Sequence, residues 1–154
     1  MKLKLSVLAT LFALAVCPAT ADTVVWGNGS GWTMGGSLKR YAKEVNRLYF
    51  RGDSVEVRGT SCTSACNLVL FLSDRVCTEP QVRWSFHMTS VAGLGIPMWK
   101  SEQEKVDNLF KQAFSAYPGL WEWYRDNARD NYLPTTLTGQ QMHDTFGVNL
   151  CPDQ

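Results

Sequence analysis

The sequence predicts a small α/β domain with a mainly parallel sheet and a helical C-terminal half. In the first half of the chain, short β-branched runs alternate with segments of helical periodicity, which is the pattern of βαβ units. From about residue 100 onward, apolar residues recur mainly at helical spacing. The chain has 154 residues, and removal of a predicted leader of 21 leaves 133, enough for one domain with a substantial core.

The first 21 residues have the pattern of a secretory signal peptide. Two lysines precede an apolar run over residues 5–16, and the small residues of 18–21 suit cleavage before Asp22. The run is short for a bilayer span. Lipid attachment at Cys17 is an alternative, which the large residue before this cysteine disfavours. We therefore predict that residues 22–154 form a single domain that is periplasmic or secreted, with no membrane contact after the leader is removed.

The charge of the domain disfavours two classes of partner. The chain has 15 basic and 14 acidic residues, and the leader contains Lys2 and Lys4 but no acidic residue. The 13 basic and 14 acidic residues that remain give a net charge of −1, and they form no continuous basic run. Nucleic acid and anionic membranes are therefore not expected partners.

The first elements follow from local patterns. The β-branched residues of Thr23–Trp26 predict a strand, and the glycine-rich residues 27–36 predict a loop. Ser37 is a preferred N-cap residue. The apolar residues that follow it recur at helical spacing, which predicts an amphipathic helix to about Phe50.

The next segment contains the most informative motif of the chain. Arg51–Asp53 predicts a turn into a strand over Val55–Arg58, and its Arg-Gly-Asp sequence needs no adhesion function. A sharp turn at Gly59 is expected to lead into a buried helix from about Ser64 to Leu72, because this segment contains an unbroken apolar run. The alternating residues of Gln81–Phe86 predict another strand.

Three helices are predicted in the second half, after a glycine-containing loop over Met88–Pro97. Ser101–Glu104 has the sequence of a capping box and precedes an apolar stripe at helical spacing. Pro118 is expected to open a helix that runs to about Arg129. A second capping box at Thr138–Gln141 predicts a last short helix, which ends near Gly147.

Cysteine usage agrees with an oxidising compartment. Without the leader, the chain keeps four cysteines: Cys62, Cys66, Cys77 and Cys151. An even number in an exported domain predicts two disulfides, with three connectivities open. A zinc site at Cys62 and Cys66 is the alternative, which the distance of both histidines in sequence disfavours, so no metal is expected. Because these two cysteines flank Ser64, at least one bridge is expected to brace that turn.

Ser64 and His87 are the candidate reactive residues. Ser64 is predicted in the first turn of a helix, where unpaired N–H groups and the helix dipole favour negative charge. His87 follows the end of a predicted strand, where catalytic groups are commonly displayed. The alternatives are a helix-capping serine and a structural histidine. The other histidine, His143, is expected to be a surface residue of the last helix.

Four segments in order resemble the Clp protease/crotonase superfamily, which includes the Clp proteolytic subunit and signal peptide peptidases. They are Met34–Ser37 opening a helix, Thr63–Cys66 opening a buried helix, Trp84–His87 at a strand end, and Leu137–Gly147. The match spans about residues 35–151. The Ser-Ala-Cys motif and the positions of the later cysteines more closely resemble small exported bacterial proteins on this fold.

The resemblance implies specific roles. Ser64 is similar to the family's nucleophile and His87 to its general base. The N–H group of Ala65, with that of Gly35 or Gly36, would form the oxyanion hole. Such fixed donors stabilise the charge of a tetrahedral intermediate, and glycine lets the backbone approach the substrate closely.

The chain departs from the family pattern in two ways. The family's acid is expected near residues 133–136, which contain no carboxylate, so Asp130 is predicted to take its place, with Asn131 or a Ser-His dyad as alternatives. The family's early strands are largely absent, so the sheet is expected to be smaller or completed by a partner subunit. Homo-oligomers are expected by analogy alone.

The sequence thus favours an exported serine hydrolase that acts on a peptide or similar acyl substrate without a cofactor. The alternative is a non-catalytic binding or assembly module on the same fold. The missing acid and the reduced N-terminal sheet favour this alternative.

Overall fold

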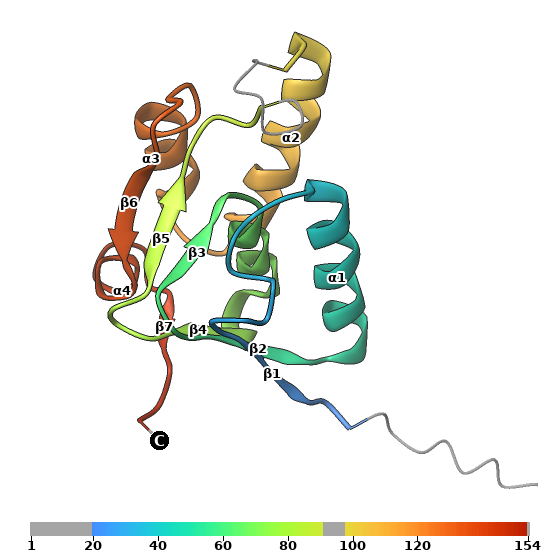
Figure 1. Cartoon of the computed structure of the whole chain (residues 1–154), viewed down its shortest axis with the longest axis vertical. Helices are drawn as coiled ribbons and strands as arrows, with labels where there is room; N and C mark the ends of the chain where they lie inside the picture. Colours follow the sequence, from blue (N-terminus) through green and yellow to red (C-terminus); the bar gives the residue numbers. More distant parts are fainter. Residues whose placement is uncertain (1–19, 91–97, 154) are drawn as a thin grey trace, which may run out of the picture.

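The computed structural model of the chain describes residues 20–90 and 98–153 (Figure 1). Almost all of the predicted leader lies outside the described residues. So do residues 91–97 of the predicted loop between Met88 and Pro97. The described residues form an α/β fold with two sheets around a buried central helix, as the alternation of strand and helix signals predicts.

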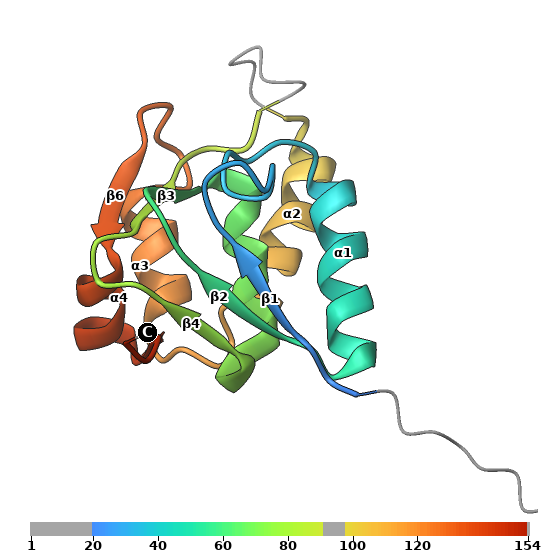
Figure 2. The same ribbon diagram turned by 60° about the horizontal axis from the view of Figure 1, so that its bottom comes forward.

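The first sheet contains four parallel strands in the order β1, β2, β4, β7, of which Figure 2 shows β1, β2 and β4 side by side. These strands are β1 (Thr23–Trp26), β2 (Ser54–Val57), β4 (Val76–Thr78) and β7 (Asn149–Leu150). Alternate residues of β2, Val55 and Val57, are buried on one face, so the β-branched run is used as a half-buried strand. The predictions for β1 and β2 are confirmed to within one residue.

The second sheet contains three strands: β3 (Ser61–Thr63), β5 (Arg83–Phe86) and β6 (Thr135–Thr138). β3 pairs with β5 in parallel, and β6 pairs with the other edge of β5 in the antiparallel sense. Four of the five strand pairings among the described residues are therefore parallel, as predicted.

The described residues form five helices: α1 (Leu38–Arg51), η1 (Ser64–Arg75), α2 (Lys100–Ala113), α3 (Leu120–Asn127) and α4 (Gly139–Phe146). The central helix η1 packs against α1, α2 and strands of both sheets (Figure 1). Its residues from Ala65 to Leu70 are all buried, because the unbroken apolar run gives it no polar face. η1 has 3-10 geometry and bends at Ser73, one residue beyond the predicted end at Leu72.

The helix ends agree only partly with the sequence signals. The capping box of α4 forms as predicted, with Thr138 and Gln141 each accepting the other's backbone N–H. Ser37 occupies the N-cap position of α1, but its side chain makes no capping hydrogen bond to a described residue. The predicted capping box at Ser101 is wrong, because α2 begins at Lys100 and Ser101 lies inside the first turn.

Two further boundaries differ from the predictions. α3 begins at Leu120 after an N-cap glycine, two residues later than the predicted opening at Pro118. The buried helix begins at Ser64 as predicted, but the strand β3 intervenes between Gly59 and this helix and pairs in the second sheet.

Four strands were not predicted: β3, β4, β6 and β7. Each has only two to four residues. Such segments are too short to show a reliable alternation of apolar and polar residues. They are strands because a neighbour supplies hydrogen-bond partners, which only the folded chain provides. β6 also interrupts the C-terminal half, which was predicted to be helical.

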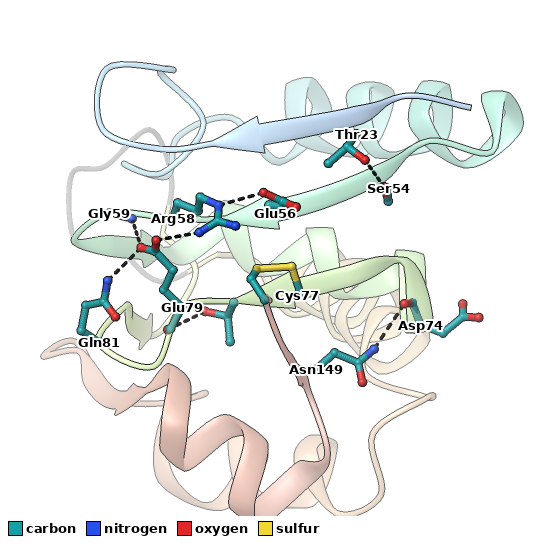
Figure 3. The surroundings of a disulfide bond; sticks show 12 residues. Thr23, Ser54, Glu56, Arg58, Gly59, Asp74, Cys77, Glu79, Gln81 and Asn149 are labelled. Atoms are coloured by element: carbon teal, nitrogen blue, oxygen red, sulfur yellow. Dashed lines mark hydrogen bonds and ion pairs between the residues drawn. A yellow bond between two sulfur atoms is a disulfide. The ribbon is translucent and has the colours of Figure 1, made fainter. Parts of the chain in front are cut away.

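The four cysteines form two disulfides, as predicted. Cys62 pairs with Cys66, and Cys77 of β4 pairs with Cys151, which directly follows β7 (Figure 3). The second bridge joins residues 74 apart and fixes the last strand to the first sheet. Within the described residues, no helix is both long and apolar enough to span a bilayer.

Candidate active site

Ser64 lies at the point where β3 ends and η1 begins. It is one of two non-glycine residues with a positive φ in the described part of the chain, with φ of 57°. A side chain rarely adopts this conformation, and holding it costs about 1–3 kcal/mol. Backbone strain of this kind is often found at functional sites. Ser64 is half-buried and lies at the N-terminus of a helix.

Two interactions hold this strained turn. The Cys62–Cys66 disulfide spans it with a Cα–Cα distance of 5.3 Å, and both cysteines are fully buried. The N–H group of Thr63 donates to the carbonyl of Thr33 at 2.9 Å, which ties the end of β3 to the glycine-rich loop. The prediction that a disulfide braces the Ser64 turn is therefore confirmed.

Strand pairing brings His87 to the same edge of the second sheet. β3 and β5 are parallel, and Thr63 lies opposite Ser85. Ser64 follows the carboxyl end of β3 directly, and His87 directly follows the carboxyl end of β5. Adjacent strands lie about 4.8 Å apart. In open α/β sheets, ligands bind at this edge, beyond the carboxyl ends of the strands.

The His87 ring is oriented by the backbone carbonyl of the next residue. Its Nδ1 lies 2.8 Å from the carbonyl oxygen of Met88. A carbonyl only accepts hydrogen bonds, so Nδ1 is the donor in this contact and Nε2 is the ring nitrogen left to accept a proton. The N–H group of Met88 in turn donates to the carbonyl of Asn131 at 2.7 Å, which fixes the segment that holds the ring.

The Gly35–Gly36 segment is held by Tyr41 of α1. The Tyr41 hydroxyl lies 3.1 Å from the carbonyl of Gly35 and 2.8 Å from that of Trp32. Burial is the main reason that the pKa of this hydroxyl is raised, so it stays protonated and can donate. Because the C=O and N–H groups of a trans peptide point in opposite directions, this contact turns the Gly36 N–H away from Tyr41.

Both glycines have backbone conformations that favour glycine, with φ of 77° at Gly35 and 130° at Gly36. A Cβ on Gly35 would lie 2.8 Å from the carbonyl oxygen of Thr63 and 3.1 Å from the Cβ of Ser64, so only glycine allows this close approach to the serine turn. A Cβ on Gly36 would meet no heavy atom of the described residues within 4 Å. Gly36 therefore faces open space.

These residues surround one cavity of about 640 Å³. Gly36, Ser64 and His87 line it, together with the apolar side chains of Met34, Leu38 and Met98. The other lining residues are serines and threonines, so His87 is the only titratable side chain among the described residues of its wall. Gly35 and Ala65 do not line the cavity. Ala65 is the second residue of η1, where the first N–H groups have no partner within the helix.

Asn67 was not identified from the sequence, although it connects the two candidate residues. It is 1% exposed on η1, and its Nδ2 donates to the carbonyl of Ser85 on β5 at 3.0 Å. Its Oδ1 is buried with no partner in the described part of the chain. The helix that begins at Ser64 is thereby fixed to the strand that precedes His87. An asparagine inside an otherwise apolar run was the available signal.

Neither side chain predicted to support His87 forms a hydrogen bond to its ring among the described residues. Asp130 is 77% exposed and pairs with Arg129 at 2.8 Å, and the hydrogen bonds of the described residues do not connect it to His87. The Asn131 side chain donates to the carbonyl of Asn127, so the alternative that this amide orients the imidazole is also unsupported. The contact at Nδ1 comes from a backbone carbonyl instead.

The remaining candidates are peripheral. His143 is an exposed residue of α4, as predicted, and its Nδ1 lies 3.0 Å from the carbonyl of Val148. Cys62 and Cys66 are joined to each other, so they offer no thiolate to a metal. In the part of the chain that the structure describes, no three His, Cys, Asp or Glu side chains gather as a metal site.

The mainly parallel sheets and the buried helix between them are consistent with a Clp protease-like α/β fold. Among solved structures, ClpP1 from Listeria monocytogenes is similar with a TM-score of 0.60 at 16% sequence identity, over 88% of this chain and 76% of that chain. No protein-family model and no curated protein matches the sequence. The likeness therefore confirms the predicted fold and goes no further. The closer resemblance to small exported proteins stays a prediction.

Proposed function

We propose that this protein is a serine peptidase or related acyl hydrolase, with Ser64 as nucleophile and His87 as general base. The observation that carries the proposal is the wall of the cavity beside β3 and β5. There a strained serine and a histidine whose Nδ1 contacts a backbone carbonyl line the same space. The fold, which is like that of ClpP1, is consistent with a peptidase but does not by itself imply one.

The proposed reaction is acyl transfer. His87 Nε2 takes the hydroxyl proton of Ser64 as Oγ forms a bond to the substrate carbonyl carbon. The tetrahedral intermediate then collapses, the bond to the leaving amine or alcohol breaks, and His87 gives that group its proton. Water repeats these steps on the acyl-enzyme, releases the acid and restores Ser64.

Backbone N–H groups would stabilise the intermediate. We assign this role to the N–H of Gly36, which lines the cavity, and to that of Ala65 at the start of η1. One such donor is worth about 10²–10³ in rate, because it is already in place when the oxyanion forms. Gly35 contributes through the close approach that brings this loop to Ser64.

The third member of the site is a carbonyl rather than a carboxylate in this proposal. The Met88 carbonyl fixes the tautomer of His87, but it carries no full charge to stabilise an imidazolium. We therefore expect a slower reaction than that of a full triad. Asp130→Asn is expected to change the rate by less than about twofold, because the carboxylate is exposed and paired with Arg129.

Labelling with a fluorophosphonate probe tests the nucleophile. The wild-type protein should be labelled on the peptide that contains Ser64, and Ser64→Ala should abolish the reaction. Ser61→Ala is a matched control, because Ser61 lies in β3 three residues earlier and does not line the cavity. His87→Ala should lower the rate of labelling by a factor of about 10²–10⁴.

Absence of labelling in folded wild-type protein with both disulfides intact would contradict the proposal. It would favour a non-catalytic binding module, which is consistent with the lack of a hydrogen-bonded carboxylate at His87 among the described residues. In that case a partner captured from the envelope fraction should bind Ser64→Ala as well as wild type.

We further propose that residues 1–21 are removed on export, leaving a single domain over residues 22–154 in the periplasm or outside the cell. The two disulfides support an oxidising location. N-terminal sequencing of the cellular protein should begin at Asp22. Sedimentation of the mature domain would test the expected self-association.

A further inference from the structure

A second cavity, of about 550 Å³, lies along the exposed side of α1 and differs in charge from the first. Four basic side chains line it: Lys39, Arg40, Lys43 and Arg47. Glu44 is its only acidic residue, and Trp32 and Phe50 add apolar surface. We refer to this cavity as the basic groove.

Most of the positive charge in the basic groove is uncompensated. Arg47 forms a two-point ion pair with Glu44, with N–O distances of 2.7 and 2.9 Å. This contact holds the pKa of Glu44 below its usual range. Lys39, Arg40 and Lys43 are exposed and form no ion pair within the described residues. Three positive charges therefore face solvent along about one turn of the helix.

One of these cations is held in place by aromatic rings. The Arg40 guanidinium carbon lies 4.4 Å from the centre of the Trp32 ring. Trp32 stacks on the fully buried Trp26 at 5.4 Å. An arginine on an aromatic face keeps its hydrogen-bond donors free for an anion, and its fixed position reduces the entropy lost on binding.

The basic groove adjoins the cavity of Ser64 and His87. Ser37, the N-cap residue of α1, lines both. Beyond it, Leu38 lines the cavity of Ser64, and Lys39 lines the basic groove. An extended ligand bound at Ser64 can therefore continue past Ser37 onto a surface that is rich in positive charge.

We infer that the substrate is an acidic peptide, with an uncharged residue at the acyl group attacked by Ser64 and carboxylates on the basic groove. This inference rests on the proposed hydrolase function. The described residues that line the cavity of Ser64 include no lysine, arginine or carboxylate, so it suits an uncharged group. The adjacent lysines and Arg40 provide complementary charge for carboxylates a few residues away.

The test compares two fluorogenic peptides with the same apolar residue at the scissile bond, flanked by glutamates in one and by glutamines in the other. The acidic peptide should have a kcat/KM about tenfold higher at low salt. This preference should fall towards unity near 1 M salt, because exposed charges are screened. The difference should appear in KM, because the lysines do not line the cavity of Ser64.

Variants of the groove sharpen the test. Lys39→Gln combined with Lys43→Gln should reduce the preference for the acidic peptide by a factor of about three to ten. The corresponding double change to glutamate should reverse the preference towards a lysine-flanked peptide. Lys111→Gln is the matched control, because it removes one exposed lysine of α2 that lines neither cavity, and it should behave as wild type.

Three results would overturn the inference. Equal hydrolysis of both peptides by wild type and the double variant would refute it and leave the proposed function intact. The same result together with lysine-dependent binding to phosphatidylglycerol vesicles would assign the groove to a membrane surface. Hydrolysis of neither peptide, without labelling of Ser64 in folded protein, would overturn the proposed function as well.

Discussion

The two sheets of this protein differ in how they are held together. The four-stranded sheet is parallel throughout, and the Cys77–Cys151 disulfide fixes its last strand across 74 residues of sequence. The three-stranded sheet carries Ser64 and His87 beyond two of its strands, and its disulfide closes a loop of only a few residues. The first region therefore contributes mainly stability, and the second region positions the candidate residues Ser64 and His87, with backbone strain at Ser64.

A charged cluster lies where the chain crosses between the sheets (Figure 3). Arg58 bridges Glu56 and Glu79, with N–O distances of 2.8 and 2.9 Å. The other oxygen of Glu79 accepts from the N–H of Gly59 at 2.9 Å. This cluster fixes the direction in which the chain leaves β2 towards β3 and Ser64.

Removing each disulfide in turn is expected to give the largest effects on stability. By the loop-closure model, Cys77→Ala with Cys151→Ala should cost about 4 kcal/mol, and Cys62→Ala with Cys66→Ala about 2 kcal/mol. Labelling of Ser64 should show the opposite order, because only the short bridge spans the serine turn. Urea unfolding and labelling rates measure the two quantities. Equal slowing of labelling in both variants would remove the distinction between the two regions.

Asn67→Asp should destabilise the protein by about 2–4 kcal/mol at neutral pH, because it places a carboxylate in a buried site beside the Ser85 carbonyl. Asn149→Asp is the matched control. This residue of β7 makes the same type of contact, from its amide to the carbonyl of Asp74, but it is exposed (Figure 3). Its change should cost less than about 0.5 kcal/mol. Similar losses from both variants in urea unfolding would show that Asn67 has no special role.

Ser64→Gly should stabilise the protein by about 1 kcal/mol while abolishing probe labelling. Glycine adopts a positive φ without strain, so the variant releases the energy held at this turn. Ser61→Gly is the control, because this residue of β3 has no positive φ and should lose stability instead. Loss of stability in Ser64→Gly, measured as a lower Tm, would contradict the strain argument.

Protonation of Glu79 in acid should lower the free energy of unfolding by about 1 kcal/mol, because its contacts with Arg58 and Gly59 are weakened. The hydrogen bond from Gly59 is the largest reason that the pKa of Glu79 is lowered from the usual 4.5. Stability from this group is therefore present above pH 4.5 and is lost as the pH falls through the lowered pKa. Glu79→Gln should flatten the dependence of stability on pH in this range. Glu104→Gln, at an exposed position of α2, should leave it unchanged. If the free energy of unfolding of Glu79→Gln fell in acid as steeply as that of wild type, this contribution would be ruled out.

Local patterns predicted the features that depend on residues close in sequence. The strand at β2, the buried helix after Ser64 and the capping box of α4 follow from alternation, an apolar run and a pair of polar side chains. The pairing of Cys62 with Cys66 was not predicted, although a bridge at the Ser64 turn was. The strands β3 and β6 gave no comparable signal, because they become strands only through pairing with β5.

The sequence by itself determined the fold class, the number of disulfides and the choice of Ser64 and His87 as candidate residues, because each depends on composition or on short-range spacing. The tertiary structure decided which groups surround them. It placed the Met88 carbonyl at Nδ1 of His87, and it placed Asn67 between helix and strand. These arrangements depend on strand register and helix packing, which bring together residues far apart in the chain.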